Sequence, residues 1–236
     1  MDDSFCQKSK IIYVLIQKFA QSNFKISNLG QSILIDPGIF NREIYKKGTD
    51  IFGHIDAIFI THKHPDHFDL EQVSSIYKTY KPKIYSTGEN VKTCQENGVT
   101  ANNFSIGQLA SFGAITVEAV PANHHVRWGE FQGEQVDAFG LVIACGHKKI
   151  YHTSDTIPPI KAPKSVSLIL LPIGGRNVFS VVEACHFARE VKPDLVIPMH
   201  YDAPQDNKVN PNDLYGCLKP VGIETKILKF DDSLNV

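Results

Sequence analysis

Six consecutive positions of the chain contain three histidines and an aspartate, in the order His62-x-His64-x-Asp66-His67. Neutral imidazole is the commonest protein ligand for transition metals, and a carboxylate adds a hard oxygen donor. His62 and His64 are two residues apart, so in an extended backbone both project to the same side and can bind one ion. Pro65 forces a turn that directs Asp66 and His67 toward a second position. The segment therefore predicts a metal site, with either one crowded ion or two ions roughly 3.5–4 Å apart.

Three further candidates for metal binding each follow a predicted strand: His124, Asp155 and His200. Two ions would need about three ligands besides the histidine-rich loop, so these candidates would complete a two-ion site. The Pro-Ala-x-His pattern favours His124 over His125 as the ligand, and His125 is then expected to line the pocket. The alternative interpretations are a polar surface loop for the first cluster and strand-end or turn residues for the later positions.

The elements that must position these residues are short strands mixed with a few helices. Apolar or alternating runs predict strands at 11–16, 24–26, 32–35, 56–60, 83–86, 115–120, 140–145, 149–152, 168–171, 195–198 and 225–228. Helical periodicity and capping residues predict helices at 70–80, 89–97, 180–191 and 211–218. The mixture favours sheets packed between helices, with strand-end loops meeting at one edge. That edge is where the polar clusters fall.

Composition is that of an ordinary folded domain. The chain has 236 residues, of which 42% are apolar and 21% charged, and no linker or repeat divides it, so we expect one domain over 1–236. The formal net charge of -1 gives no support for a nucleic-acid partner. The N-terminal apolar run at 11–16 is too short to cross a bilayer, and we expect no stable membrane insertion.

The five cysteines are widely spaced and form no C-x-x-C pair: Cys6, Cys94, Cys145, Cys185 and Cys217. This pattern predicts reduced thiols that serve as small apolar core residues. Together with an N-terminus that lacks the charge of a signal peptide, it predicts a cytoplasmic protein.

The order of these motifs resembles that of the metallo-β-lactamase-fold superfamily of metal-dependent hydrolases. The segments 171–175, 183–184 and 196–201 are similar to those of a branch that contains ascorbate-6-phosphate lactonases and N-acylphosphatidylethanolamine phospholipase D. The resemblance covers about residues 12 to 230. It implies an α+β fold, the four-layer αββα sandwich, with the site at one edge of the two sheets.

The resemblance also implies which residues bind metal. A first ion would be bound by His62, His64 and His124, a second by Asp66, His67 and His200, and Asp155 would bridge the two. Zinc is the default metal for this ligand set, although Mn or Fe also fits it. One departure concerns a Gly-His-(Ala/Ser) segment in many relatives, where this chain has Ala20-Gln21-Ser22.

The function that follows is hydrolysis of a small ester, lactone or phosphodiester. Two divalent ions would stabilise a bridging hydroxide as the nucleophile, and Asp66 would orient it and shuttle its proton. The alternative is a non-hydrolytic di-iron redox or sensor protein on the same scaffold. Redox relatives tend to carry Glu where this chain has His64, which favours hydrolysis.

Substrate recognition is assigned to residues near the later motifs: His125, Arg127, Trp128, Arg176 and Tyr201. An arginine beside metal ions favours a phosphate or carboxylate group, so we expect a small-molecule substrate that carries an anionic group. Trp could stack on a ring, and the tyrosine could donate to an oxyanion. The alternatives are an exposed salt bridge for Arg127 and a place in the core for Trp128. A homo-oligomer is compatible with the sequence.

Overall fold

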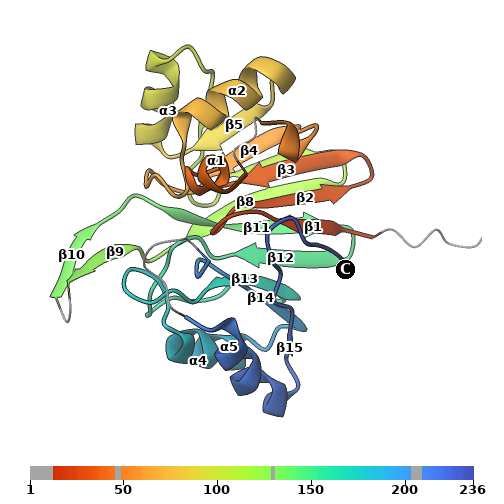
Figure 1. The fold of residues 1–236 in the computed structure, drawn as a ribbon, viewed down its shortest axis with the longest axis vertical. Helices are drawn as coiled ribbons and strands as arrows, with labels where there is room; N and C mark the ends of the chain where they lie inside the picture. The colour runs from red at the N-terminus through yellow and green to blue at the C-terminus, as the bar shows by residue number, and fades with distance from the viewer. Residues whose placement is uncertain (1–12, 46–48, 129–130, 203–208) are drawn as a thin grey trace, which may run out of the picture.

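The computed structural model describes residues 13–45, 49–128, 131–202 and 209–236 and contains two seven-stranded sheets packed face to face (Figure 1). From edge to edge, the first sheet consists of β16 (Ser233–Asn235), β1 (Leu15–Lys18), β2 (Phe24–Asn28), β3 (Gln31–Ile35), β4 (Ala57–Ile60), β5 (Lys83–Ser86) and β6 (Asn102–Asn103). The second consists of β15 (Glu224–Thr225), β14 (Leu195–Met199), β13 (Leu168–Pro172), β12 (Lys148–His152), β11 (Phe139–Cys145), β8 (Ile115–Pro121) and β7 (Leu109–Phe112).

Helices cover the outer face of each sheet (Figure 1). The first sheet is covered by α1 (Phe40–Tyr45), η1 (Thr49–Phe52), α2 (Leu70–Tyr80) and α3 (Gly88–Glu96), and the second by α4 (Val181–Val191), α5 (Pro211–Leu218) and η2 (Lys219–Val221). The result is the predicted α+β sandwich with the layer order αββα.

Local sequence explains where the principal helices begin and end. The side chain of Asp69 accepts the backbone N–H of Glu71 and so caps α2, which ends at Lys81 in the left-handed conformation. Ser180 and Glu183 form a reciprocal capping box at the start of α4. These signals account for the agreement between the predicted helices and the observed ones.

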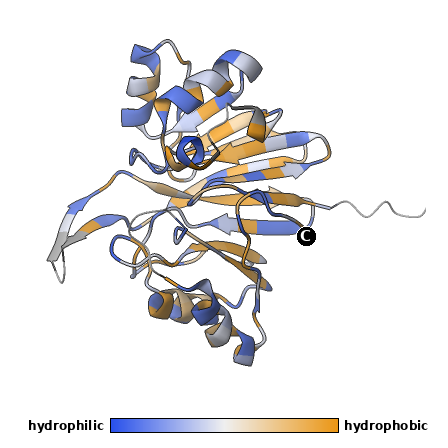
Figure 2. Ribbon diagram, viewed as in Figure 1, coloured by the Kyte–Doolittle hydropathy of each residue, from blue (hydrophilic) through white to orange (hydrophobic). Residues whose placement is uncertain are grey.

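Apolar side chains fill the space between the sheets and the space under the helices. Strands β4, β13 and β14 are buried along their whole length. Because both faces of these strands are covered, their sequences are continuous apolar runs rather than alternating ones. Figure 2 shows the hydrophobic residues concentrated in the two sheets and the hydrophilic ones on the outer helices.

In each sheet, a parallel part carries most of the candidate ligands; the exception is His124, which follows the antiparallel strand β8. Strands β3 to β6 run parallel in the first sheet, as do β12 to β15 in the second. The carboxyl ends of β4, β12 and β14 carry the segments that contain His62, Asp155 and His200. Parallel pairing therefore brings sequence-distant loops to the same edge.

A two-stranded hairpin of β9 (His125–Trp128) and β10 (Phe131–Gln135) projects away from the sandwich (Figure 1). The backbone N–H of Val136 donates to the carbonyl oxygen of His124 over 2.9 Å, which closes the base of the hairpin. His124 is therefore held at the point where the hairpin leaves the body of the protein.

Some predicted elements were wrong or incomplete. The strand expected at 225–228 is observed as the shorter β15 at Glu224–Thr225, and the backbone N–H of Lys226 makes one further hydrogen bond to Val196 of β14. The strand expected at 11–16 is observed as β1 from Leu15, and positions 11–12 lie outside the described residues. The prediction missed α1, β6, β7, β16 and the β9–β10 hairpin.

The interpretation of all cysteines as reduced thiols was also wrong. Cys185 of α4 and Cys217 of α5 form a disulfide that links the two helices. Cys94 and Cys145 are free and buried, as predicted, and burial raises the pKa of each thiol to about 11. Cys6 lies outside the described residues. In the described part of the chain, no helix has the length and apolar character needed to cross a membrane.

Candidate metal centre

The histidine-rich loop follows β4 and is fixed by a buried aspartate at the end of the neighbouring strand. Asp36 accepts the backbone N–H of Thr61 over 2.7 Å and the hydroxyl of Thr61 over 2.8 Å. It also lies 2.8 Å from Nδ1 of His67. One carboxylate thus holds both ends of the loop. The sequence analysis missed this role. Asp36 begins the segment Asp36-Pro37-Gly38, where the backbone N–H of Gly38 donates to the carbonyl oxygen of Asp36 over 2.9 Å and closes a tight turn.

The glycine of that turn allows the loops to approach closely. A Cβ atom on Gly38 would lie 1.9 Å from the carbonyl oxygen of Asp66. No side chain fits at this position without moving the backbone of the loop. Gly38 is therefore required for the position of Asp66.

Four side chains form what we call the first group: His62, His64, His124 and Asp155. Nδ1 of His64 lies 3.1 Å from Nε2 of His62 and 3.1 Å from Nε2 of His124. Oδ2 of Asp155 lies 3.9 Å from Nε2 of His62 and 3.9 Å from Nε2 of His124. One atom from each residue thus converges on a common point, and His124 rather than His125 belongs to the group.

Four side chains likewise form the second group: Asp66, His67, Asp155 and His200. Nε2 of His200 lies 3.1 Å from Oδ2 of Asp66 and 3.3 Å from Oδ2 of Asp155. Nε2 of His67 lies 3.5 Å from Asp66 and 3.1 Å from Oδ1 of Asp155. Asp155 belongs to both groups, so the two groups share one carboxylate.

The donor atoms fit divalent transition metals. Around a tetrahedral ion with Zn–N bonds of about 2.0–2.1 Å, ligand atoms lie about 3.3 Å from one another, close to the spacing of the imidazole nitrogens. Nε2 of His67 and Oδ1 of Asp155 are buried and have no hydrogen-bond partner among the described residues, although they lie 3.1 Å apart. Two such atoms without hydrogen-bond geometry are arranged as ligands of one cation would be. The residues present could therefore hold metal at both groups.

The histidines of the first group are kept neutral. Burial, with a contribution from His67, holds the pKa of His62 well below its usual value. Burial also lowers the pKa of His64, and it lowers the pKa of His124 to about 4 although Asp155 acts in the opposite direction. Neutral imidazoles have the lone pair that a metal ion needs.

The second group has the opposite electrostatics. Burial favours the neutral form of His200, but Asp155 and Asp66 overcome it and raise its pKa to about 10. The same balance, with Asp36 added, raises the pKa of His67 well above its usual value. Burial alone would raise the carboxyl pKa values of Asp66 and Asp155. His67 and His200 outweigh burial and hold both pKa values well below the usual one. Without metal, this group is therefore a compensated cluster of ions.

Comparison with known proteins identifies the family. A family model described as beta-lactamase superfamily domain matches residues 15–200, a range that contains every member of the two groups. A UPF0173 metal-dependent hydrolase from Polynucleobacter asymbioticus is 30% identical over 210 residues, which is 78% of this chain and 73% of the relative. The chain belongs to the metallo-β-lactamase superfamily.

Within this superfamily, the chain is a metal-dependent hydrolase of the UPF0173 type. The similar protein from Methanocaldococcus jannaschii is 28% identical over 230 residues, covering 94% of this chain and 100% of the relative. The solved structure of Igni18, a metallo hydrolase from Ignicoccus hospitalis, superimposes with a TM-score of 0.72 at 22% identity. It covers 95% of this chain and 98% of the other, so the two share the whole fold.

A buried histidine outside both groups connects two loops of this hydrolase. Nε2 of His152 lies 2.9 Å from the carbonyl oxygen of Ser22, and its Nδ1 accepts the backbone N–H of Ser154 over 3.2 Å. The ring is therefore neutral, with its proton on Nε2. His152 ties the turn after β1 to the loop that carries Asp155.

The residues assigned to substrate recognition lie on the β9–β10 hairpin and on the loops after β13 and β14. Nδ1 of His125 lies 3.4 Å from the carbonyl oxygen of Gly133, across the hairpin. Arg127 and Trp128 belong to β9, but their side chains lie outside the described part of the structure. Arg176 is exposed on the loop after β13, in the left-handed conformation with a φ of 57°.

The hydroxyl of Tyr201 donates to the carbonyl oxygen of Leu228 over 3.3 Å. Burial, with Asp202 adding to it, raises the pKa of this hydroxyl well above its usual value. The hydroxyl is thus engaged with the backbone near the C-terminus, so this arrangement does not direct it to an oxyanion in the metal centre.

Proposed function

We propose that this hydrolase cleaves a small ester, lactone or phosphodiester with two divalent metal ions held by the two groups. The observation that carries the proposal is the pair of converging ligand sets that share Asp155. A single crowded ion would not require seven donor residues divided in this way. His62, His64 and His124 would hold one ion, and Asp66, His67 and His200 the other.

The ligand set favours zinc, although manganese or iron fits the same residues. When bound, two such cations lower the pKa of a water molecule between them and polarise a carbonyl or phosphoryl oxygen. The protein contributes the fixed positions of the donors and a site that is closed on most sides.

Differences in burial indicate the side from which substrate enters. His62, His67, His124 and Asp155 are buried. His64 is partly exposed, and the side chains of Asp66 and His200 are 21% and 14% exposed. A substrate would therefore approach over these partly exposed residues, opposite the buried ones.

Asp66 is the carboxylate best suited to orient a water molecule and move its proton. Its side chain is 21% exposed, whereas that of Asp155 is 4% exposed. Its low pKa keeps it ionised, so it accepts hydrogen bonds at neutral pH. We therefore assign the proton-transfer role to Asp66 and the shared-ligand role to Asp155.

The substrate is proposed to be a small molecule, with an anionic group recognised by Arg127 and Arg176. Arg127 follows His124 by three residues, and Arg176 is exposed on the loop after β13. Nucleic acid and a membrane surface are not proposed as partners, since the formal net charge is only -1.

Metal analysis of the purified protein, followed by hydrolysis assays, tests the proposal. We expect about two zinc or manganese ions per chain and hydrolysis of at least one class among lactones, carboxylic esters and phosphodiesters, lost on chelation and restored by metal. A coloured, iron-loaded protein without hydrolytic activity would instead support the redox alternative. A stoichiometry of one ion in a fully active protein would overturn the two-ion assignment.

A further inference from the structure

The ammonium group of Lys18 is buried inside the protein, next to the second group. Lys18 is the last residue of β1 and is 0% exposed. Its Nζ donates to the carbonyl oxygen of Phe19 over 2.8 Å and forms an ion pair with Oδ2 of Asp202. Asp202 lies two residues after His200, so the pair joins the first sheet to the loop that carries this histidine.

Aromatic rings surround the buried charge. The Nζ atom lies 5.9 Å from the ring centre of Phe24, 5.8 Å from that of Tyr201 and 5.3 Å from that of Phe230. Such rings exclude water from the charge, and an unpaired charge in such a place is costly. The positive charge of Lys18 therefore needs the negative charge of Asp202 beside it.

The turn after β1 transmits this pairing to the ligands. Oδ1 of Asp202 accepts the backbone N–H of Gln21 over 3.0 Å, and the backbone N–H of His200 donates to the carbonyl oxygen of Gln21 over 3.4 Å. Gln21 and His200 both have positive φ angles, 56° and 55°. This backbone conformation is disfavoured for such residues and persists only where surrounding contacts fix it. The ion pair supplies one of those contacts.

We infer that Lys18 and Asp202 are positioning residues for the second metal ion, because they hold His200 where its ring meets Asp66 and Asp155. The inference rests on the two-ion assignment of the proposed function. It predicts a selective effect. In the described part of the chain, the ring nitrogens of the first group's histidines contact one another, Thr61 and Asp155, but neither member of the ion pair.

The test is a metal titration of metal-free Lys18→Met. Methionine keeps the unbranched apolar stem of the side chain and removes the ammonium group, with its ion pair to Asp202 and its hydrogen bond to Phe19. We expect the variant to bind its first ion as the wild type does and its second ion about 10–100-fold more weakly, as is typical when a supporting contact of a metal ligand is lost. Competition with a chromophoric chelator gives both affinities for zinc, and the absorption of bound cobalt reports ligand geometry.

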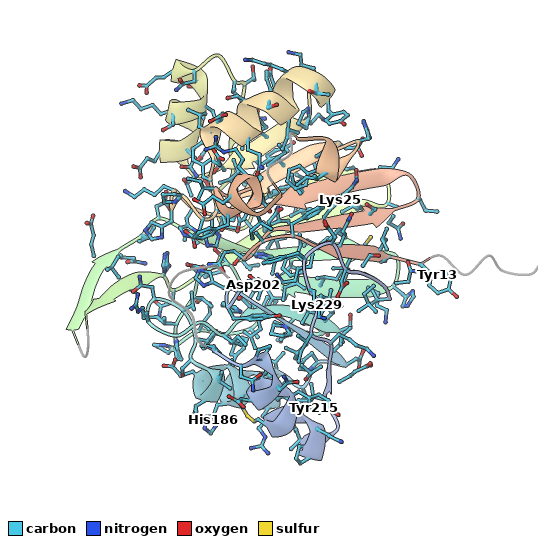
Figure 3. All side chains as sticks on the ribbon, in the orientation of Figure 1. Tyr13, Lys25, His186, Asp202, Tyr215 and Lys229 are labelled. Atoms are coloured by element: carbon cyan, nitrogen blue, oxygen red, sulfur yellow. A yellow bond between two sulfur atoms is a disulfide. The ribbon has the colours of Figure 1, made fainter. Side chains whose placement is uncertain are left out.

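Lys25→Met is the matched control. Lys25 is a partly buried lysine on the adjacent strand β2, but its Nζ donates to the carbonyl oxygen of Phe52, away from the metal centre. Figure 3 labels both Lys25 and Asp202 and shows them in different parts of the molecule. The control should bind both ions with wild-type affinity.

Asp202→Asn guards against a folding defect in Lys18→Met. Asparagine keeps an oxygen for the N–H of Gln21 and loses the charge that pairs with Lys18. Its second ion should also be weakened selectively, with a cooperative thermal unfolding transition retained. If Lys18→Met does not fold, this variant decides the question alone.

The possible results of these titrations separate the positioning role of Lys18 and Asp202 from the proposed two-ion function. Two ions in the wild type, with an unchanged second affinity in a folded Lys18→Met or Asp202→Asn, would overturn the positioning role and leave the proposed function intact. Equal weakening of both ions would also overturn it, since the effect would not be selective. A wild type that binds one ion would overturn the two-ion assignment and this inference together.

Discussion

The two ligand groups share Asp155 but differ in the protons they hold. In the first group, burial keeps His62 and His124 neutral. In the second, the carboxylates raise the pKa values of His67 and His200 above the usual one. The first group therefore has imidazole nitrogens with lone pairs directed at a common point. The second group has protonated histidines, whose protons a bound cation would replace.

This difference suggests an order of events. A cation can enter the first group without displacing protons, whereas the second group must exchange protons for its ion. Both groups reach solvent, the first through His64 and the second through Asp66 and His200. We therefore expect the first group to bind metal more tightly and the second to exchange it more readily.

The largest effect should follow removal of the shared carboxylate. Asp155→Ala removes a ligand from both groups and leaves the buried histidines uncompensated. Loss of metal-assisted stabilisation worth several kcal/mol corresponds to a fall in kcat/KM of about a thousandfold. Elemental analysis and hydrolysis assays measure both consequences. Glu190→Ala, an exposed carboxylate of α4, is the control. If Asp155→Ala kept the metal content and the activity of the wild type, Asp155 would not be a ligand shared by the two groups.

Much of the fold and the histidine-rich loop could be predicted because their signals are local. The helix at 70–80 was predicted with its exact observed bounds, since Asp69 caps it and Pro82 follows it. His62 to His67 are adjacent in the chain, so their chemistry could be recognised before any contact was known.

The remainder depends on contacts between distant residues. Asp36 acts on Thr61 and His67, which lie 25 and 31 positions away. Lys18 lies beyond the strand expected at 11–16, and its burial depends on the contact with Asp202 in the loop after β14. The Cys185–Cys217 disulfide joins residues 32 positions apart in helices whose pairing no local pattern specifies.

Asp36→Asn should give the next largest effect and would sharpen the contrast between the groups. The variant removes the negative charge beside Nδ1 of His67 while nearly preserving shape. We expect the second ion to bind about 10–100-fold more weakly and the first to change less, since Asp36 contacts His67 of the second group directly but is linked to His62 of the first group through Thr61. Stepwise metal titration measures both affinities. An equal loss in both groups would mean that Asp36 supports the whole loop rather than His67.

The dependence of metal binding on pH tests the electrostatic difference directly. Because His67 and His200 have raised pKa values, they are protonated in the metal-free protein at neutral pH and must release protons to bind metal. The second affinity should therefore rise with pH, by up to about tenfold per pH unit for each proton displaced. His124, with a pKa of about 4, has already lost its proton, so the first affinity should stay nearly constant. Calorimetry in two buffers of different ionisation enthalpy measures the protons released at each step. Equal proton release at both steps would show that the groups do not differ as described.

The smallest effect is expected from Gln21→Ala. The side-chain amide of Gln21 donates to Oδ2 of Asp66 over 3.5 Å, a long and therefore weak hydrogen bond. The backbone contacts of Gln21 with Asp202 and His200 remain in the variant. A loss of about 0.5–1 kcal/mol gives a two- to fivefold weaker second ion and a similar fall in kcat/KM. The same titrations and assays resolve such a change when wild type and variant are measured side by side. A loss as large as that of Asp36→Asn would mean that the amide, rather than the backbone of the turn, fixes Asp66.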